Sequence, residues 1–148
     1  MIEIKKIKKL KKETGVSLSK CKEALEKSEG DIERAKELLK ETYGILAQKL
    51  KERKTKEGII EAYVHSGKKI GSMIKLLCES DFVAKSPDFQ KLAHELCLQI
   101  VAQDPKEIPL LEQNWIRDER KKVKELIEEY IAKFGENIVV EEFSRFQI

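Results

Sequence analysis

The sequence predicts an α+β protein in which an N-terminal three-helix bundle precedes a core of a three-stranded antiparallel sheet packed against helices. Residues 1–44 carry three short amphipathic segments separated by glycines. Residues 57–148 interleave three strand-like runs with two long helical patterns. Charge divides the chain too, with 17 basic and 10 acidic side chains in residues 1–56 against 13 and 17 in the rest. We therefore expect two domains, 1–44 and 57–148, joined by a linker helix over 45–56.

The first domain is expected to form three short helices with recognisable ends. Gly15 follows the first apolar stripe and predicts its end, and Ser17 is suited to cap the second helix. Gly30 ends the second helix, Asp31 caps the third, and the third is expected to close near 43–44. The side chains expected to face the core of this bundle are Ile4, Ile7, Leu10, Leu18, Cys21, Ala24, Leu25, Ile32, Ala35, Leu38 and Leu39.

The second domain begins with two runs rich in Ile, Val and Tyr, at 58–65 and 70–79. Residues 66–69 between them suit a hairpin turn, so the two strands should pair antiparallel. The tail at 138–146 predicts a last strand. In the second run, the residues that share a face by a period of two are Ile70, Ile74, Leu76 and Cys78.

Two long helices are expected between the second strand and the last. Ser86 and Pro87 form a cap and first-turn pair, and this helix should stop before Pro105. A short loop containing Pro109 follows, and Gly135 ends the second helix. The side chains expected to be buried are Phe89, Leu92, Ala93, Leu96, Ile100, Val101, Val123, Leu126, Ile127, Tyr130, Ile131 and Phe134.

The composition argues against several classes of protein. No run approaches the ~18 apolar residues of a membrane span, and the start of the chain is too charged for a signal peptide. Three cysteines without a CxxC motif argue against a disulfide scaffold or a structural zinc site, and favour a reducing, cytoplasmic compartment. There is no glycine-rich phosphate loop. We expect neither a cofactor nor a metal ion.

Residues suited to catalysis are few, so we expect no enzyme active site. His94 and Cys97 lie three apart on a predicted helix and would form half of a metal site, but a packing role is favoured. His65 ends a strand before a turn, where a surface histidine is more common than a catalytic base. A metal-dependent or hydrolytic enzyme using these histidines is the weakest hypothesis.

The first helix is strongly basic, which raises the question of nucleic-acid binding. The first aromatic residue is Tyr43, so the segment lacks interleaved aromatic side chains, and a solvated helix face is favoured. An RNA- or ribosome-binding accessory protein remains the alternative function. The lysines concerned are Lys5, Lys6, Lys8, Lys9, Lys11 and Lys12.

The connection at 80–85 is unusual because it carries Phe82 and Val83, whereas loops between a strand and a helix are normally polar. Two interpretations stand. Phe82 either folds back onto the core or forms an aromatic anchor for a partner, with the charge of Asp81 fixing orientation.

At this segment the sequence resembles the translation elongation factor Ts family, in its short form. The hallmark of that family is a Thr-Asp-Phe-Val-Ala segment, and residues 77–93 read LCESDFVAKSPDFQKLA. Residues 10–39 resemble the family's ubiquitin-associated-like three-helix module, residues 62–79 its core hairpin, and residues 123–146 the end of short members. The similarity covers nearly the whole chain in the family's order.

The resemblance implies a guanine-nucleotide exchange factor whose partner is elongation factor Tu, bound to GDP or free of nucleotide. It assigns partner contact and dislocation of Mg²⁺ to Ser80, Asp81, Phe82 and Val83, with the Asp-Phe pair inserting into the nucleotide domain of Tu. The N-terminal module docks elsewhere on that domain. No membrane and no specific nucleic acid are implied as partners.

Several positions depart from the family's pattern. Ser80 replaces the usual threonine and keeps the hydroxyl. Residues 18–20 stand where methionines and an acidic residue are usual, and Glu141 and Glu142 stand where relatives often have basic residues. Residues 104–109 pass directly between two helices where many relatives carry an insertion. Because the chain has no room for a second core subdomain, a symmetric homodimer is a possible partner arrangement.

Overall fold

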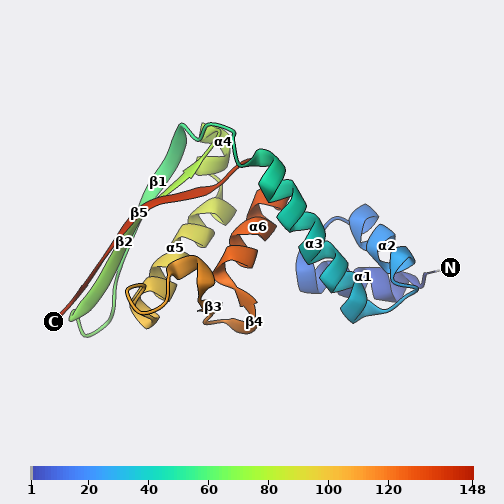
Figure 1. Cartoon of the computed structure of the whole chain (residues 1–148), viewed down its shortest axis with the longest axis horizontal. Helices are drawn as coiled ribbons and strands as arrows, with labels where there is room; N and C mark the ends of the chain where they lie inside the picture. Colours follow the sequence, from blue (N-terminus) through green and yellow to red (C-terminus); the bar gives the residue numbers. More distant parts are fainter. Residues whose placement is uncertain (1) are drawn as a thin grey trace. The chain divides into compact units, whose positions relative to one another are not determined.

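The computed structural model describes residues 2–148 and confirms the α+β class (Figure 1). The chain forms two compact units, residues 1–46 and residues 47–148. No helix in the described part of the chain is both long enough and apolar enough to cross a membrane.

The first unit contains α1 (Ile4–Thr14), α2 (Leu18–Lys27) and most of α3 (Ile32–Leu50). The predicted helix boundaries at Gly15, Ser17 and Asp31 are confirmed, whereas α2 ends at Lys27, before the predicted Gly30. Gly15 caps α1 in the left-handed region at φ 73°, the Ser17 hydroxyl accepts the Lys20 amide at 3.4 Å, and Asp31 accepts the Arg34 amide at 3.1 Å. The fully or nearly buried side chains are Leu10, Cys21, Ala24, Leu25, Ala35, Leu39 and Tyr43.

Two expectations for this unit are wrong. The third helix does not close near 43–44, because α3 runs through Gly44 to Leu50, which is buried. A single glycine in a helix costs about 1 kcal/mol, which the continuing apolar stripe offsets. Ile4 and Leu18 do not face the core: they stand at the first turn of their helices and are 69% and 47% exposed.

The second unit is built on a three-stranded antiparallel sheet of order β1-β2-β5. Its strands are β1 (Glu57–Val64), β2 (Ile70–Cys78) and β5 (Val139–Gln147). The predicted hairpin and C-terminal strand are therefore confirmed, and the C-terminal strand pairs with β2 as an edge strand. Ile74, Leu76 and Cys78 share the buried face of β2, as the period of two predicts.

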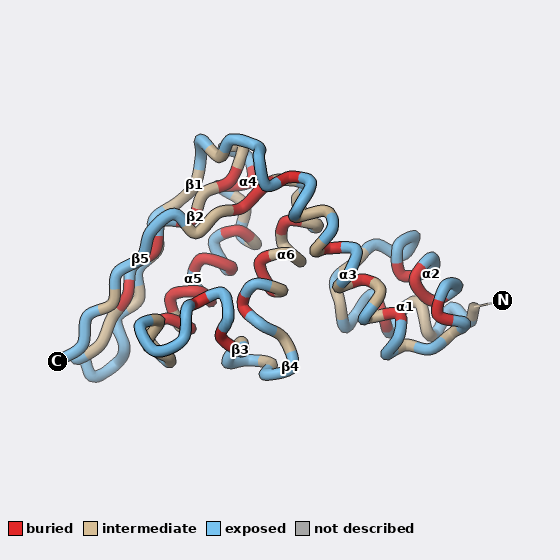
Figure 2. Tube along the Cα trace, in the orientation of Figure 1, coloured by how far each residue is buried: buried red, intermediate tan, exposed pale blue. Residues whose placement is uncertain are grey.

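Helix α5 (Pro87–Ala102) covers one face of this sheet, and α6 (Val123–Phe134) packs with it to complete the core (Figure 2). The predicted caps are confirmed: the Ser86 hydroxyl accepts the Phe89 amide at 3.2 Å, and Gly135 ends α6 at φ 67°. Val101, Tyr130 and Phe134 are half-buried rather than buried.

Four short elements were not expected from the sequence. Helix α4 (Asp81–Ala84) replaces the predicted strand-to-helix loop. A 3₁₀ turn (Leu110–Glu112) and the hairpin of β3 (Asn114–Trp115) and β4 (Asp118–Lys122) lie where a plain loop was expected. The charged run at 118–122 has no strand-like alternation, so periodicity gives no signal for it.

Candidate protein-binding site

The segment that carries Phe82 forms the single turn α4, and a serine hydroxyl makes a hydrogen bond at each of its ends. The Ser80 hydroxyl accepts the Val83 amide at 3.2 Å. The Ser86 hydroxyl donates to the Val83 carbonyl at 2.7 Å and so closes the far end of the turn. The amide and the carbonyl of Val83 therefore both bond to nearby serine side chains, and these two hydrogen bonds define the geometry of the turn.

The turn directs its apolar side chains to opposite sides. Val83 and Ala84 face inward and are 5% and 2% exposed, whereas Phe82 is 86% exposed. Of the two interpretations of Phe82, the structure excludes packing on its own core. Val83, which the family resemblance grouped with the contact residues, lies beneath the turn and anchors it. α4 contacts the open end of the β1–β2 hairpin, where β1 begins and β2 ends (Figure 1).

A charged pair flanks the exposed ring. The Asp81 carboxylate accepts a hydrogen bond from the Lys85 ammonium at 2.8 Å, one helical turn later. Both side chains are more than half exposed. The hydrogen bond to Asp81 raises the pKa of Lys85. An acidic group, an aromatic ring and a basic group thus stand on one solvent-facing turn.

The base of the turn is held by Glu136, a residue that the sequence analysis missed. Its Oε1 accepts the amides of Glu79 at 3.1 Å and Ser80 at 3.0 Å, and its Oε2 accepts the Ser80 hydroxyl at 2.6 Å. Glu136 follows Gly135, the predicted end of α6, but no motif distinguishes it from the other carboxylates of the chain. Its role depends on a contact across 56 residues of sequence.

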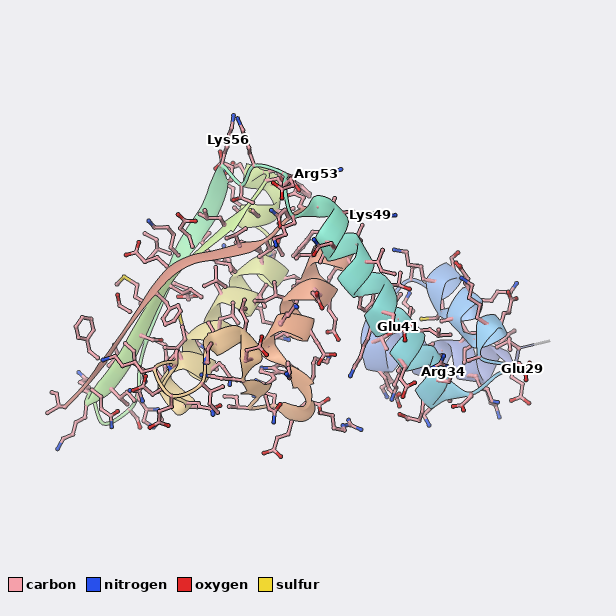
Figure 3. All side chains as sticks on the ribbon, viewed as in Figure 1. Glu29, Arg34, Glu41, Lys49, Arg53 and Lys56 are labelled. Atoms are coloured by element: carbon pink, nitrogen blue, oxygen red, sulfur yellow. The ribbon has the colours of Figure 1, made fainter. Side chains whose placement is uncertain are left out.

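A second set of contacts ties the same corner to the chain that leaves α3. The side-chain nitrogen Nδ2 of Asn137 donates to the carbonyls of Lys51 at 3.3 Å and Arg53 at 3.0 Å. The Glu79 carboxylate accepts the Asn137 backbone amide at 2.6 Å and pairs with Arg53 at 3.6 Å. Arg53 lies just beyond the end of α3 (Figure 3).

Cys78, at the end of β2, lies directly below this network. Its thiol is fully buried and donates to the Ser80 carbonyl at 3.3 Å. Burial, followed by the charge of Glu136, raises the pKa of Cys78 to about 11. The thiol is therefore protonated at neutral pH and acts as a packing group and weak donor.

The candidate metal ligands do not form a site. His65 and His94 are exposed, and both contact Tyr63: the Tyr63 hydroxyl lies 2.9 Å from His65 Nδ1, and His94 packs edge-on against the Tyr63 ring. Cys97 is buried, and its thiol donates to the Glu61 carbonyl at 3.5 Å. Within residues 2–148, no group of three or more His, Cys, Asp or Glu side chains is placed to hold a metal ion.

The basic face of α1 is largely solvated. Lys6 is an exception, since its ammonium donates to the Gly30 carbonyl at 2.9 Å and ties α1 to the end of α2. Leu10 is fully buried on the opposite face. This is the arrangement of an amphipathic helix packed in a bundle, with its lysines on the solvated face, which was the favoured interpretation.

Aromatic side chains are among the residues that contribute most to protein–protein contacts, so Phe82 is the candidate contact residue of this turn. The comparisons with known proteins specify the class. The family model described as elongation factor TS matches residues 79–148, which include the turn, Glu136 and β5.

Curated relatives match almost the entire chain. Elongation factor Ts of Thermotoga neapolitana is 38% identical over 186 residues, covering 96% of this chain and 94% of the relative. The factors of Caldanaerobacter subterraneus subsp. tengcongensis and Herpetosiphon aurantiacus are 35% and 34% identical, covering 99% of this chain and 96% and 98% of the relatives. The chain belongs to the elongation factor Ts family. Because the alignments are longer than its 148 residues, these relatives carry segments that it lacks.

Proposed function

We propose that this protein is a guanine-nucleotide exchange factor for the translation GTPase elongation factor Tu and acts in the cytoplasm. Membership of the elongation factor Ts family supports this role. The factor binds Tu carrying GDP, weakens the hold on Mg²⁺ and GDP, and leaves Tu open to GTP. No covalent bond changes in this reaction, so the chain needs a contact surface rather than an enzyme active site.

Asp81 and Phe82 are the residues we propose to enter the nucleotide domain of Tu, near the Mg²⁺ site. The observation that carries this proposal is the 86% exposure of Phe82 on a turn whose backbone is fixed from both ends. Burying such a ring in a partner yields about 1.5–3 kcal/mol. Because the turn is already ordered, little conformational entropy is lost on binding.

The binding energy of the ring can be compared with the loss of GDP affinity that exchange requires. Each 1.4 kcal/mol directed against GDP weakens its binding about tenfold, so the ring alone explains only part of a large exchange effect. Wider contact surfaces, including the N-terminal unit, must supply the remainder. The coupling is reciprocal. The factor lowers the affinity of Tu for GDP by the same ratio as GDP lowers the affinity of Tu for the factor.

The test is the release of fluorescent GDP from purified Tu at increasing concentrations of factor. Replacing Phe82 with alanine should cost at least about 2 kcal/mol, or roughly thirtyfold in exchange activity, as for other aromatic hot spots. The melting temperature should hardly change, because the ring makes little contact with its own chain. Leu111→Ala is the control, since it removes another exposed apolar side chain of the same unit.

Exchange by Phe82→Ala equal to that of the unaltered protein would refute the role of the ring. Loss of exchange in the Leu111 control as well would show that the assay reports general damage. The alternative of an RNA- or ribosome-binding protein predicts a different result, namely no effect on Tu and binding to ribosomal RNA with a steep dependence on salt.

We also propose that the protein forms a homodimer through the sheet face that α5 leaves uncovered. By the strand register, this face carries Ile60, Val64, Met73 and Phe146, which are all more than half exposed. The same face carries the exposed Lys75–Glu142 ion pair, and a sheet face with this many exposed apolar side chains is expected to be covered by a partner. Met73→Glu should yield monomers in sedimentation equilibrium while Leu111→Glu remains dimeric. An unaltered protein that is monomeric at all concentrations would refute the dimer.

A further inference from the structure

We infer that Glu136 is a positioning residue for nucleotide exchange, because it fixes the direction in which Phe82 projects. The inference rests on the proposed function of Phe82. Glu136 is not among the four residues, Ser80 to Val83, to which the family resemblance assigns partner contact, and its hydrogen bonds go to Glu79 and Ser80 rather than to Phe82. Its carboxylate is half-buried beneath α4, at the junction between α6 and β5.

The carboxylate is placed to hold both residues that lead into the turn. It accepts two backbone amides, from Glu79 and Ser80, which are no longer within the ladder of β2. It also accepts the Ser80 hydroxyl at 2.6 Å. Hydrogen bonds to a charged acceptor are roughly twice as strong as neutral ones, so three together define the entry of the chain into α4.

The Ser80 hydroxyl transmits this constraint to the turn itself. As donor it is committed to Glu136, and as acceptor it takes the Val83 amide at 3.2 Å. With its hydrogen directed at Glu136, a lone pair of the hydroxyl is directed at Val83. Phe82 lies between Ser80 and Val83, whose positions these hydrogen bonds fix. The backbone of Phe82 is therefore held in place, although its ring makes no hydrogen bond.

The position of Glu136 is itself fixed on either side. Gly135 ends α6 in the left-handed region and turns the chain towards the end of β2. Asn137 is 5% exposed and is held by Glu79 and by the carbonyls of Lys51 and Arg53. Glu136 is therefore part of a rigid corner, and not a side chain of a mobile loop.

The experiment measures GDP release from Tu, with the maximal rate and the half-saturating factor concentration determined separately. Glu136→Ala should lower the maximal rate by roughly tenfold, as expected for the loss of hydrogen bonds to a charged group. Glu136→Gln keeps the shape of the side chain and one acceptor oxygen, so its maximal rate should lie between those of Glu136→Ala and the unaltered protein. Glu119→Ala, an exposed glutamate on β4, is the matched control and should leave the rate unchanged.

A double-mutant cycle distinguishes positioning from a general effect on the fold. If Glu136 acts through Phe82, adding Glu136→Ala to Phe82→Ala should cause little further loss. Ser80→Ala should resemble Glu136→Ala, and Ser80→Thr should lose less than Ser80→Ala because it keeps the hydroxyl. Hydrogen exchange of the Val83 amide should be faster in Glu136→Ala and unchanged in Glu119→Ala.

Each outcome bears on a different claim. If Phe82→Ala slows release and Glu136→Ala does not, the inference is overturned and the proposed function stands. Additive losses in the double mutant, or unchanged exchange of the Val83 amide, also overturn the inference. If Phe82→Ala leaves release unaffected, the proposed function of the ring fails first, and the positioning role fails with it.

Discussion

The side-chain amides of Gln99 and Gln113, both buried, are joined by a hydrogen bond of 2.9 Å from Gln99 Nε2 to Gln113 Oε1. Gln113 Nε2 also donates to the carbonyls of Gln103 and Ile108, and Gln99 Oε1 accepts the Ile116 amide. These two side chains therefore satisfy the backbone of the connection between α5 and α6. They hold the part of this connection that precedes the 3₁₀ turn, residues 103–109, which has no helix or strand of its own.

Gln113→Ala is expected to destabilise the second unit by about 2–4 kcal/mol, because it leaves buried polar groups without partners. Urea unfolding followed by circular dichroism would measure this change. Gln90→Ala is the matched control, since Gln90 is an exposed glutamine on α5. Equal unfolding midpoints for the two variants would contradict the role of the buried pair.

Gly58 is required by the close approach of β1 and β2. A Cβ atom at this position would lie 2.3 Å from the Leu76 carbonyl oxygen and 2.8 Å from the Leu77 Cα. Since both atoms belong to the backbone, Gly58→Ala must shift a strand, and we expect a loss of about 1–3 kcal/mol. Gly67→Ala in the hairpin turn meets nothing within 4 Å and should be tolerated. Similar melting temperatures for both variants would refute the expectation.

The buried thiol of Cys97 should make stability fall at alkaline pH. Burial raises the pKa of Cys97 from about 9 to about 11. Between these values the unfolded chain loses a proton that the folded protein keeps, so the free energy of unfolding should fall by about 1.4 kcal/mol per pH unit from this thiol. Below pH 9 the contribution is constant. Urea unfolding between pH 8 and pH 10.5 should show a shallower decline for Cys97→Ala than for the unaltered protein, and parallel curves would contradict this.

Asp81 is expected to matter for the partner and not for the fold. Its ion pair with Lys85 is exposed, and exposed pairs contribute little to stability. Asp81→Asn should therefore keep the melting temperature while slowing GDP release from Tu. Lys85→Ala breaks the same pair but keeps the carboxylate, so it should slow release less. Equal losses in the two variants would show that the pair, and not the carboxylate, is needed.

Most of the fold could be predicted because its signals are local. The caps at Ser17, Asp31 and Ser86 and the stop at Gly135 depend on bonds within one turn of helix, and the structure contains all of them. The end of α3 was mispredicted because Gly44 is a weak helix breaker when apolar side chains continue on both sides. The hairpin of β3 and β4 was missed because its charged residues lack any alternation.

The candidate site was predicted only in part. The apolar residue in a polar connection drew attention to Phe82, and the family resemblance assigned it a role. Neither could decide whether the ring was exposed. That outcome depends on Val83 and Ala84 filling the space beneath the turn, and on Glu136 reaching it from the far end of the sequence.

By itself the sequence determined the α+β class, the hairpin, the last strand and the family, since these follow from periodicity, caps and an ordered set of motifs. The tertiary structure decided which way the turn at 81–84 faces, and which of many similar carboxylates holds it. The reason is physical: periodicity and capping act within a few residues, whereas the contact of Glu136 with Ser80 exists only after β2, α6 and β5 have packed together.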